Sequence, residues 1–303
     1  MTEQEIIDKL TLGQRKAPSI HGIGDDAATV IEHRVVTCDT MVEGIHWDDK
    51  LSPADVGWKI VAINASDIGA MGGRPEWCTL SLALTESTAS DWVDEFAKGM
   101  RSALRRWNIN LIGGDTARSP NNIVVTMTMS SRKGYHWAWQ HDAEPGDDIW
   151  VTGTLGEAAS GFFEPNKHPY NTALQRPEPP VAFANTIVHN RFVHALTDIS
   201  DGLHSEITRI CSRSQVGAIL DPSTFPASSV LYGNKRTLAF QTAFGEDYEY
   251  LFTAPNRSEN VLRRTAARYK TTIHKIGRIQ NTSMEVRLKN KEWPAPLFNH
   301  FGS

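Results

Sequence analysis

The stretch SPADVGWKIVAINASDIGAMGG, residues 52–73, decides how the rest of the chain is interpreted. It predicts a helix whose core-facing side carries a carboxylate that is unfavourable to bury. Ser52 suits a helix N-cap, and Pro53 suits the first helical position. Asp67 lies on the apolar face of this helix, which is formed by Val56, Ile60, Ile63 and Met71. Burying an unpaired carboxylate is expensive, so we expect a cation from outside the helix to meet Asp67. Bonds to local backbone N–H groups or to a distant Arg are the alternative.

Length and composition indicate a soluble globular protein. The 303 residues are enough for two domains, each with its own core. Hydrophobic residues make up 40 % of the chain and charged residues 22 %, which is ordinary for soluble proteins. The formal net charge of −4 gives no overall attraction to nucleic acid or to anionic membranes. We therefore expect neither among the partners.

The cysteines and the N-terminus favour a cytoplasmic location. The three cysteines are widely spaced and form no CxxC pattern, which argues against a disulfide framework and against a thiolate zinc site. The N-terminal residues, MTEQEIIDKL, are too polar and acidic for a signal peptide. No apolar run approaches the ~20 residues that a membrane span needs.

Strands that alternate with helices, together with hairpin-like neighbouring strands, indicate an α/β fold with mixed sheets of the α+β type. The pattern dissolves into polar and aromatic residues between 131 and 148, so we expect two α/β domains, 1–135 and 136–303. In the first domain we expect helices at 3–12 and 90–107 and strands at 28–31, 34–38, 76–84, 110–112 and 121–130. In the second we expect strands at 149–152, 217–220, 248–252, 272–279 and 284–288, and helices at about 181–194, 203–213 and 258–269.

Acidic residues recur at turns that are expected to end strands or apolar runs, namely Asp25 and Asp26, Asp39, Asp115, Asp198 and Asp201, and Glu246 and Asp247. Surface turns favour Asp for local reasons, so each alone reads as a turn former. If they converge near Asp67, each pair of carboxylates ~5 Å apart repels by about 3 kcal/mol at an effective dielectric near 20. Divalent cations remove this repulsion, and ligands that are all oxygen suit Mg²⁺ or Ca²⁺ rather than zinc.

A magnesium site held by few carboxylates commonly brings a phosphate ligand, usually of a nucleotide. The chain contains no GxxxxGK[ST] loop and no kinase catalytic-loop pattern. The turn Gly153–Gly156, between a predicted strand and a short helix, is either a phosphate cradle or a plain tight turn. His46 is either a ligand contact or an ordinary loop histidine.

Six motifs resemble, in order, those of the thiamine-monophosphate kinase family, which belongs with aminoimidazole ribonucleotide synthetase and selenophosphate synthetase. They are GIGDD at 22–26, TCDT at 37–40 with VEGIH at 42–46, NASDIGAMGG at 64–73, GGDTAR at 113–118, DISDGL at 198–203 and GEDYEY at 245–250. The resemblance implies a synthetase-like fold, in which an N-terminal α/β domain dimerises through its sheet and a C-terminal α/β sandwich domain completes the site. It also implies a homodimer that transfers the γ-phosphoryl group of ATP to thiamine monophosphate, giving thiamine diphosphate.

The resemblance also assigns site residues by position. A cluster of several Mg²⁺ ions around the nucleotide phosphates would be held by Asp26, Thr37, Cys38, Asp39, Asp67, Asp115, Asp198 and Asp201. Among these, Asp67, Asp115 and Asp201 would be the catalytic residues. ATP would contact Gly114, Asp115, Gln140 and Ser200, and thiamine monophosphate would contact His46, Glu246 and Phe298.

Three positions depart from the family pattern. Cys38 stands where the family usually has Thr, and because a thiol is a poor Mg²⁺ ligand only its backbone suits the role. Gln140 and Pro180 each stand where the family has Arg. The cations that could compensate on the ATP side are Arg118, Arg132 and Lys133.

The implied reaction needs no general base, because the second pKa of a phosphate monoester is near 6 and the attacking oxygen is mostly ionised at pH 7. Many Asp residues and no obvious catalytic His or Lys fit such a reaction. Two alternatives stay open. One is an ATP-dependent synthetase of the same superfamily that activates an amide or a selenide, and the other is a non-catalytic metal-binding scaffold.

Overall fold

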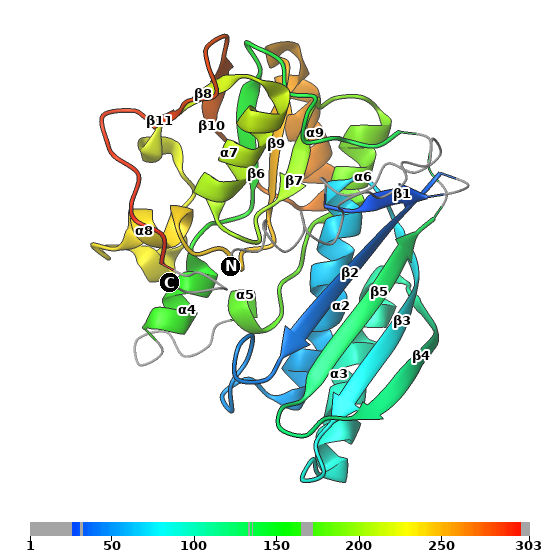
Figure 1. Ribbon diagram of the computed structural model, residues 1–303. Helices are drawn as coiled ribbons and strands as arrows, with labels where there is room; N and C mark the ends of the chain where they lie inside the picture. The colour runs from blue at the N-terminus through cyan, green and yellow to red at the C-terminus, as the bar shows by residue number, and fades with distance from the viewer. Residues whose placement is uncertain (1–25, 31–32, 133, 135, 165–171, 298–303) are drawn as a thin grey trace, which may run out of the picture.

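The computed structural model describes residues 26–30, 33–132, 134, 136–164 and 172–297 (Figure 1). The helix expected at 3–12 and the candidate substrate contact Phe298 lie outside these residues. Within them the chain forms two mixed sheets, one built from residues 28–131 and the other from residues 148–288. The division into domains at residue 135 stays a prediction.

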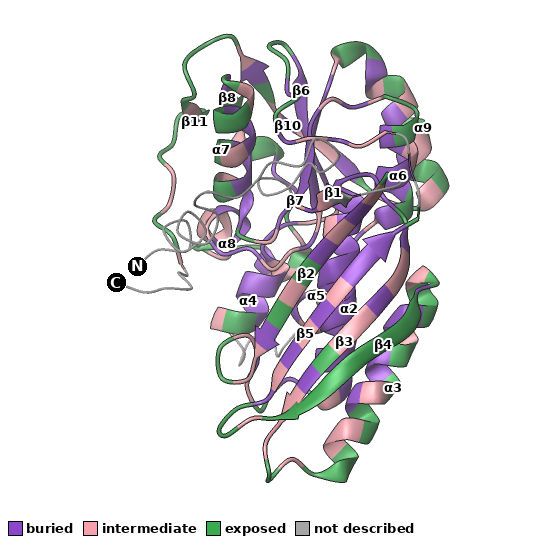
Figure 2. Ribbon diagram, turned by 45° about the vertical axis from the view of Figure 1, so that its right-hand side comes forward, coloured by how far each residue is buried: buried purple, intermediate pink, exposed green. Residues whose placement is uncertain are grey.

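The first sheet has the strand order β1-β2-β5-β3-β4, and β3 and β4 are its only parallel pair among the described residues. Its strands are β1 (Ala28–Val30), β2 (Arg34–Val42), β3 (Pro75–Leu84), β4 (Asn110–Arg118) and β5 (Val124–Ser131). The expected hairpin is confirmed, since β1 pairs antiparallel with β2. Helices α2 (Pro53–Ala70) and α3 (Ser90–Trp107) cover one face of the sheet (Figure 1). Figure 2 shows β4 exposed along its length, whereas buried and more accessible residues are mixed along β2, β3 and β5.

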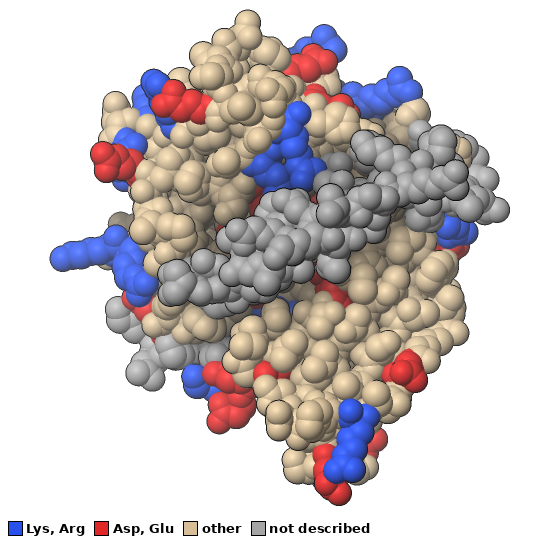
Figure 3. All heavy atoms as spheres, viewed as in Figure 1, with Lys and Arg blue, Asp and Glu red and all other residues tan. Residues whose placement is uncertain are grey.

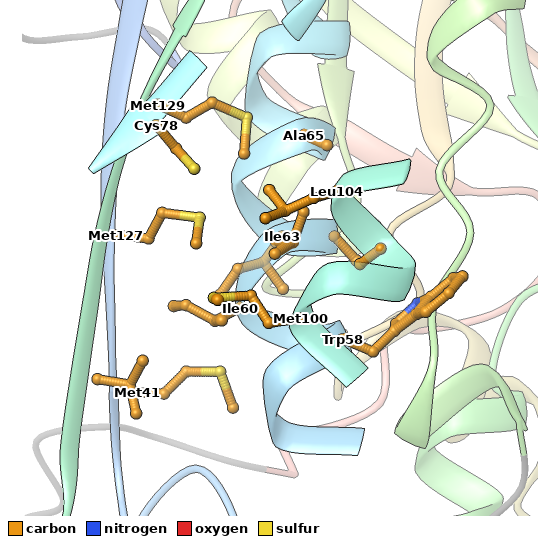
Figure 4. Packing of buried hydrophobic residues seen from close by; sticks show 14 of the residues in the cluster. Met41, Trp58, Ile60, Ile63, Ala65, Cys78, Met100, Leu104, Met127 and Met129 are labelled. Atoms are coloured by element: carbon orange, nitrogen blue, oxygen red, sulfur yellow. The ribbon is translucent and has the colours of Figure 1, made fainter. Parts of the chain in front are cut away.

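Helix α2 is the centre of the molecule. Its N-cap is Ser52, whose Oγ accepts a hydrogen bond from the backbone N–H of Asp55, and Pro53 occupies the first turn, as the sequence predicts. One side of α2 packs on the first sheet and α3, while another contacts α6 and β7 of the second half. Alternate side chains of the sheet, including Met41, Cys78, Met127 and Met129, pack against it (Figure 4). This double packing explains why α2 is buried almost throughout.

Two glycines bring α2 and α3 close together. A Cβ on Gly57 would lie 2.2 Å from the carbonyl oxygen of Phe96, and one on Gly99 would lie 1.8 Å from that of Ala54. Neither distance is sterically possible, so glycine is required on both sides of this helix crossing.

The second sheet has the strand order β11-β8-β10-β6-β9-β7. Its strands are β6 (Asp148–Thr152), β7 (Leu196–Asp198), β8 (Gly217–Leu220), β9 (Tyr250–Ala254), β10 (Ile273–Gln280) and β11 (Val286–Leu288). The helices of this half are α4 (Glu157–Phe163), α5 (Thr172–Gln175), α6 (Val181–His189), α7 (Leu203–Ser214), α8 (Thr237–Thr242) and α9 (Glu259–Tyr269). No described helix is both long and apolar enough to cross a membrane.

Three expectations about the elements were wrong. Strand β2 does not stop at Asp39 but continues to Val42, paired throughout with β5. Strand β4 does not break at Gly113-Gly114-Asp115, because these glycines serve close strand pairing rather than a turn. A Cβ on Gly114 would lie 1.9 Å from the carbonyl oxygen of Leu80. The helix expected to reach residue 194 ends at His189, and β7 follows it.

Acidic and basic side chains are interspersed on the face shown in Figure 3. This distribution agrees with the small net charge of −4. On this face, the described residues therefore show little of the one-sided charge that typifies nucleic-acid-binding surfaces.

Candidate active site

Three carboxylates from distant parts of the sequence meet between the two halves of the molecule. Asp26 precedes β1, Asp67 lies on α2 and Asp198 ends β7. Each offers an oxygen within 4.8 Å of the others. The convergence expected from the sequence is therefore found for these three acids, which we call the acid cluster.

Strand β2 adds two side chains to the acid cluster. Residues 37 and 39 alternate with outward-facing residues, so Thr37 and Asp39 both face α2. The hydroxyl of Thr37 donates a hydrogen bond to Oδ2 of Asp67. Oδ2 of Asp39 is buried and has no hydrogen-bond partner among the described residues. An orphaned buried carboxylate oxygen calls for a partner such as a water molecule or a cation.

Burial and mutual repulsion raise the pKa values of the carboxyl groups in and beside the acid cluster. Burial raises the pKa of Asp39 to about 6. Burial and the negative charges of Asp39, Asp198 and Asp26 raise the pKa of Asp67 well above its ordinary value. Burial and the charge of Asp26 likewise raise the pKa of Asp198. Ionising all of these groups near neutral pH is therefore unfavourable without a cation.

Neutral side chains of the described residues help to position the acid cluster. The hydroxyl of Ser66 donates to Asp198 at 2.6 Å, across the interface between the halves. Gln140 Nε2 donates to Asp26 at 3.0 Å, and Thr197 Oγ1 donates to the other oxygen of Asp26 at 2.8 Å. In the described part of the chain, no Lys or Arg forms an ion pair with Asp67 or Asp198.

The donor set fits a hard divalent cation. It consists of carboxylate oxygens and one hydroxyl, with no imidazole and no thiolate among Asp26, Thr37, Asp39, Asp67 and Asp198. Mg²⁺ prefers such oxygen ligands, and it would satisfy the orphaned oxygen of Asp39. Among the described residues, no distant Arg forms an ion pair with Asp67, so the alternative of an Arg partner finds no support there.

The turn after β7 places Ser200 and Asp201 beside the acid cluster, and the charge of Asp201 contributes to the raised pKa of Asp198. Asp201 itself accepts a hydrogen bond from Arg209 at 3.2 Å. Arg209 also pairs at 2.6 Å with Glu206, which is fully buried.

Glu246 lies where its own loop packs tightly against the loop that carries Ser200. Its backbone N–H donates to the carbonyl oxygen of Ser200 at 2.9 Å, and a Cβ on Gly245 would lie 2.1 Å from that oxygen. The carboxylate of Glu246 forms an ion pair with Lys59 of α2, whose side chain is 4 % exposed. Sequence reasoning missed Lys59. The available signal was its place seven residues before Ser66, which puts both residues on one face of α2.

Gly114 and Asp115 do not join the acid cluster within one chain. Asp115 pairs in register with Ser81 of β3, which pairs with Thr126 of β5. This row of residues points to the exposed face of the sheet, opposite the face that carries Asp39. Strand β4 lies at the edge of the sheet, and every residue in it is exposed.

The remaining candidates have other surroundings. His46 lies in the turn after β2, where its Nδ1 accepts a hydrogen bond from the backbone N–H of Val42 at 3.0 Å. Cys38 is exposed on the outer face, and its sulfur accepts a hydrogen bond from Thr128 at 3.4 Å. At the turn Gly153–Gly156, the N–H of Gly156 donates to Asp247 at 3.0 Å, which favours the plain tight turn over the phosphate cradle.

The cations considered as replacements for the family arginines lie elsewhere. Arg118 pairs with Glu86 near the ends of β4 and β3. Pro180 and Arg132 line a separate cavity that none of the three acids of the acid cluster lines. Lys133 falls outside the described residues.

Comparison with known proteins shows the family to which the chain is similar. The family models for the AIR synthase related protein match residues 24–132 (N-terminal domain) and 144–289 (C-terminal domain). A thiamine-monophosphate kinase of Buchnera aphidicola subsp. Acyrthosiphon pisum is 32% identical, covering 99% of each chain.

Solved structures of related proteins resemble this chain in both fold and sequence. The crystal structure of the thiamine-monophosphate kinase from Stenotrophomonas maltophilia K279a has a TM-score of 0.78, is 34% identical and covers 95% of each chain. AaThiL complexed with AMPPCP and TMP has a TM-score of 0.85 and is 26% identical, covering 99% of this chain and 97% of that one. Shared motifs, shared fold and identity over nearly the whole length establish that this chain belongs to the thiamine-monophosphate kinase family, within the AIR synthase related proteins.

Proposed function

We propose that the protein transfers the γ-phosphoryl group of ATP to thiamine monophosphate, forming thiamine diphosphate and ADP. The observation that carries this proposal is the meeting of Asp26, Asp67 and Asp198 from both halves of the chain. The AMPPCP and TMP bound to a relative of the same fold support the same pair of substrates. Three free cysteines suit a reaction in the cytoplasm.

Magnesium is the cofactor that the acid cluster fits. Asp26, Asp39, Asp67 and Asp198, with the hydroxyl of Thr37 beside them, would hold it. Bound Mg²⁺ would neutralise the phosphate oxygens of ATP and stabilise charge on the transferred group. The chain's own contribution is to fix these carboxylates in place through Ser66, Thr197 and Gln140.

The residues described in the site supply placement rather than proton transfer. The phosphate of thiamine monophosphate is largely ionised at neutral pH, because its second pKa is near 6. Its oxygen therefore attacks the γ-phosphorus in line with the departing ADP, and no side chain has to remove a proton. We assign the acceptor side to Glu246, which Lys59 holds from α2, together with His46 and Phe298.

A coupled assay with Mg-ATP and thiamine monophosphate tests the proposal. We expect thiamine diphosphate and ADP in equal amounts, and no product when EDTA removes Mg²⁺. ADP formed only with an amide or selenide acceptor would instead indicate a synthetase. No turnover, despite thermal stabilisation by Mg²⁺, would indicate a metal-binding scaffold.

We further propose that two chains pair through the first sheet and that Asp115 acts in the assembled dimer. Strand β4 is an edge strand with exposed apolar side chains, since Leu111 is 44% and Ile112 is 61% exposed. Edges of this kind are usually covered by another chain or protected by charges. The dimer would also bury the outer face on which Asp115 lies.

Sedimentation equilibrium should report two chains per particle, and Ile112→Glu should give monomers. The matched control is Ile219→Glu, which adds the same charge at another exposed apolar strand residue, in β8. A wild-type protein that is active as a monomer would exclude the pairing.

A further inference from the structure

A basic cavity lies at the junction of the two halves, apart from the acid cluster. It consists of two adjoining hollows of about 410 and 510 Å³ that share Arg74 and Arg132. Arg74 follows the end of α2, and Arg132 follows β5. The N–H of Arg132 donates to the carbonyl oxygen of Arg74 at 2.7 Å, so the two residues are held side by side.

The charge of the basic cavity is strongly one-sided. Its walls also carry Arg106, Lys270 and His189. Among the residues described as lining it, the only carboxylate is that of Glu178, which pairs with Arg106 at 3.3 Å. In the described residues, Arg74, Arg132 and Lys270 form no ion pair with any carboxylate. Within the described part of the chain, these three positive charges therefore have no carboxylate partner.

The protein nevertheless fixes one of these charges in place. Arg74 Nε donates to Oδ1 of Asn185 at 2.7 Å, and Asn185 donates in turn to the carbonyl oxygen of Gly72 at 2.7 Å. Asn185, which holds Arg74, is buried with 5% of its surface exposed. An arginine oriented in this way is pre-organised to bind a planar or tetrahedral oxyanion through its remaining N–H groups.

The local potential supports the same conclusion. Burial lowers the pKa of His189, and the positive charges of His136 and Arg74 lower it further. Neighbouring cations that repel a proton attract an anion for the same reason. Trp107, Tyr269 and Trp137 provide apolar wall area, and hollows of this volume are typical of small-molecule sites.

We propose that the basic cavity is a second ligand site, which binds a small molecule carrying a multiply charged phosphate group. Phosphate oxygens would accept from Arg74 and Arg132, while Lys270 would contribute charge. Because Arg74 and Asn185 come from different halves of the chain, the bound anion would also tie the halves together. The site is independent of the kinase reaction proposed above.

Calorimetric titration with sodium pyrophosphate in EDTA tests the proposal. Without Mg²⁺ the acid cluster repels phosphate, so binding there does not interfere. We expect saturable binding that weakens as NaCl is raised. Arg132→Gln and Arg74→Gln should each weaken binding by about 10- to 100-fold, as expected for the loss of charge-assisted hydrogen bonds.

The matched control is Arg257→Gln, which removes the same charge at an exposed position at the other end of α9 from Lys270. Its affinity for pyrophosphate should equal that of the wild type. Because Arg132 is exposed, we expect Arg132→Gln to have the melting temperature of the wild type. This variant therefore tests the proposal even if Arg74→Gln folds poorly.

Titration with ADP in EDTA identifies the source of the phosphate. If ADP binds more tightly than pyrophosphate and its binding depends on Arg132, the site takes a nucleotide. If pyrophosphate binds more tightly than ADP, the site takes an inorganic anion. Absence of binding to the wild type, or unchanged binding to both Arg variants, would overturn the proposal.

Discussion

Replacing Asp67 with Asn lowers the turnover of thiamine monophosphate by at least about 100-fold, while the protein stays folded; this is the largest effect that we expect from a single substitution. Changing even the partners of metal ligands commonly costs about 10- to 100-fold. Asp67 is more central than such a partner, because it meets Asp26 and Asp198 and accepts the hydrogen bond of Thr37.

The same substitution should affect stability in the opposite direction. Asp67 lies among like charges, which raise its pKa, so a neutral amide relieves repulsion in the metal-free protein. We expect the melting temperature of Asp67→Asn in EDTA to equal or exceed that of the wild type. A lower melting temperature would attribute the lost activity to damaged folding instead.

Steady-state kinetics and thermal melting measure both effects. The control is Asp94→Asn, an identical change at an exposed position of α3, which should leave turnover unchanged. Near-normal activity of Asp67→Asn would remove Asp67 from the site.

The second large effect is a pH-dependent stabilisation by magnesium. The folded-state pKa of Asp39 is raised to about 6, and those of Asp67 and Asp198 are also raised. A carboxylate whose pKa is raised on folding contributes stability below its unfolded pKa and loses it as pH rises through the folded pKa. In EDTA the acid cluster therefore destabilises the fold increasingly from about pH 4 upwards.

Histidines act in the opposite sense, because burial lowers the pKa of His189, His204 and His274. The informative quantity is therefore the difference in melting temperature with and without Mg²⁺ at each pH. We expect a rise of about 5 °C or more at about pH 8, since ~1 kcal/mol corresponds to about 2–4 °C for a protein of this size. The rise should be much smaller at about pH 5, where protonated carboxyl groups bind Mg²⁺ poorly.

Differential scanning fluorimetry over this pH range gives the measurement. Asp39→Asn should reduce the Mg²⁺-dependent rise, whereas Asp94→Asn should preserve it. An equal rise at both pH values would show that Mg²⁺ acts somewhere other than the acid cluster.

The central helix could be predicted almost completely from the sequence. Ser52, Pro53 and the apolar spacing specify its start and its face, and Asp67 on that face raises the question that the site answers. The local reason is that α2 obeys capping and periodicity rules that depend on neighbours in sequence. Helix α3 has the expected bounds, Ser90–Trp107, because its apolar side chains recur at helical spacing.

Strand β4 shows where sequence reasoning fails. Two consecutive glycines normally indicate a turn, yet Gly113 and Gly114 lie within a strand because β3 approaches too closely for a side chain at Gly114. Such a steric requirement arises from tertiary contact and leaves no local signal. As a result, the sequence indicated an acid at a strand end, whereas Asp115 lies on the outer face of an edge strand.

Interactions between distant residues were equally hard to foresee. In the sequence, Lys59 and Ser66 look like ordinary helix residues. Their roles become visible only in the fold, where Lys59 forms an ion pair with Glu246 and Ser66 donates a hydrogen bond to Asp198. The pairing of Arg74 with Arg132 likewise depends on the register between β3 and β5. The motifs supplied the identity of the acids, but only the fold shows which of them meet.

The hydrogen bonds that cross between the halves limit how ligands can enter. A hinge that swung the two sheets apart would break the bonds from Ser66 to Asp198, from Tyr250 to the carbonyl oxygen of Ser66, and from Arg74 to Asn185. It would also expose the apolar side of α2 that α6 covers. We therefore expect substrates to come and go through rearrangement of surface loops around a rigid frame, rather than by jaw-like opening of the whole molecule.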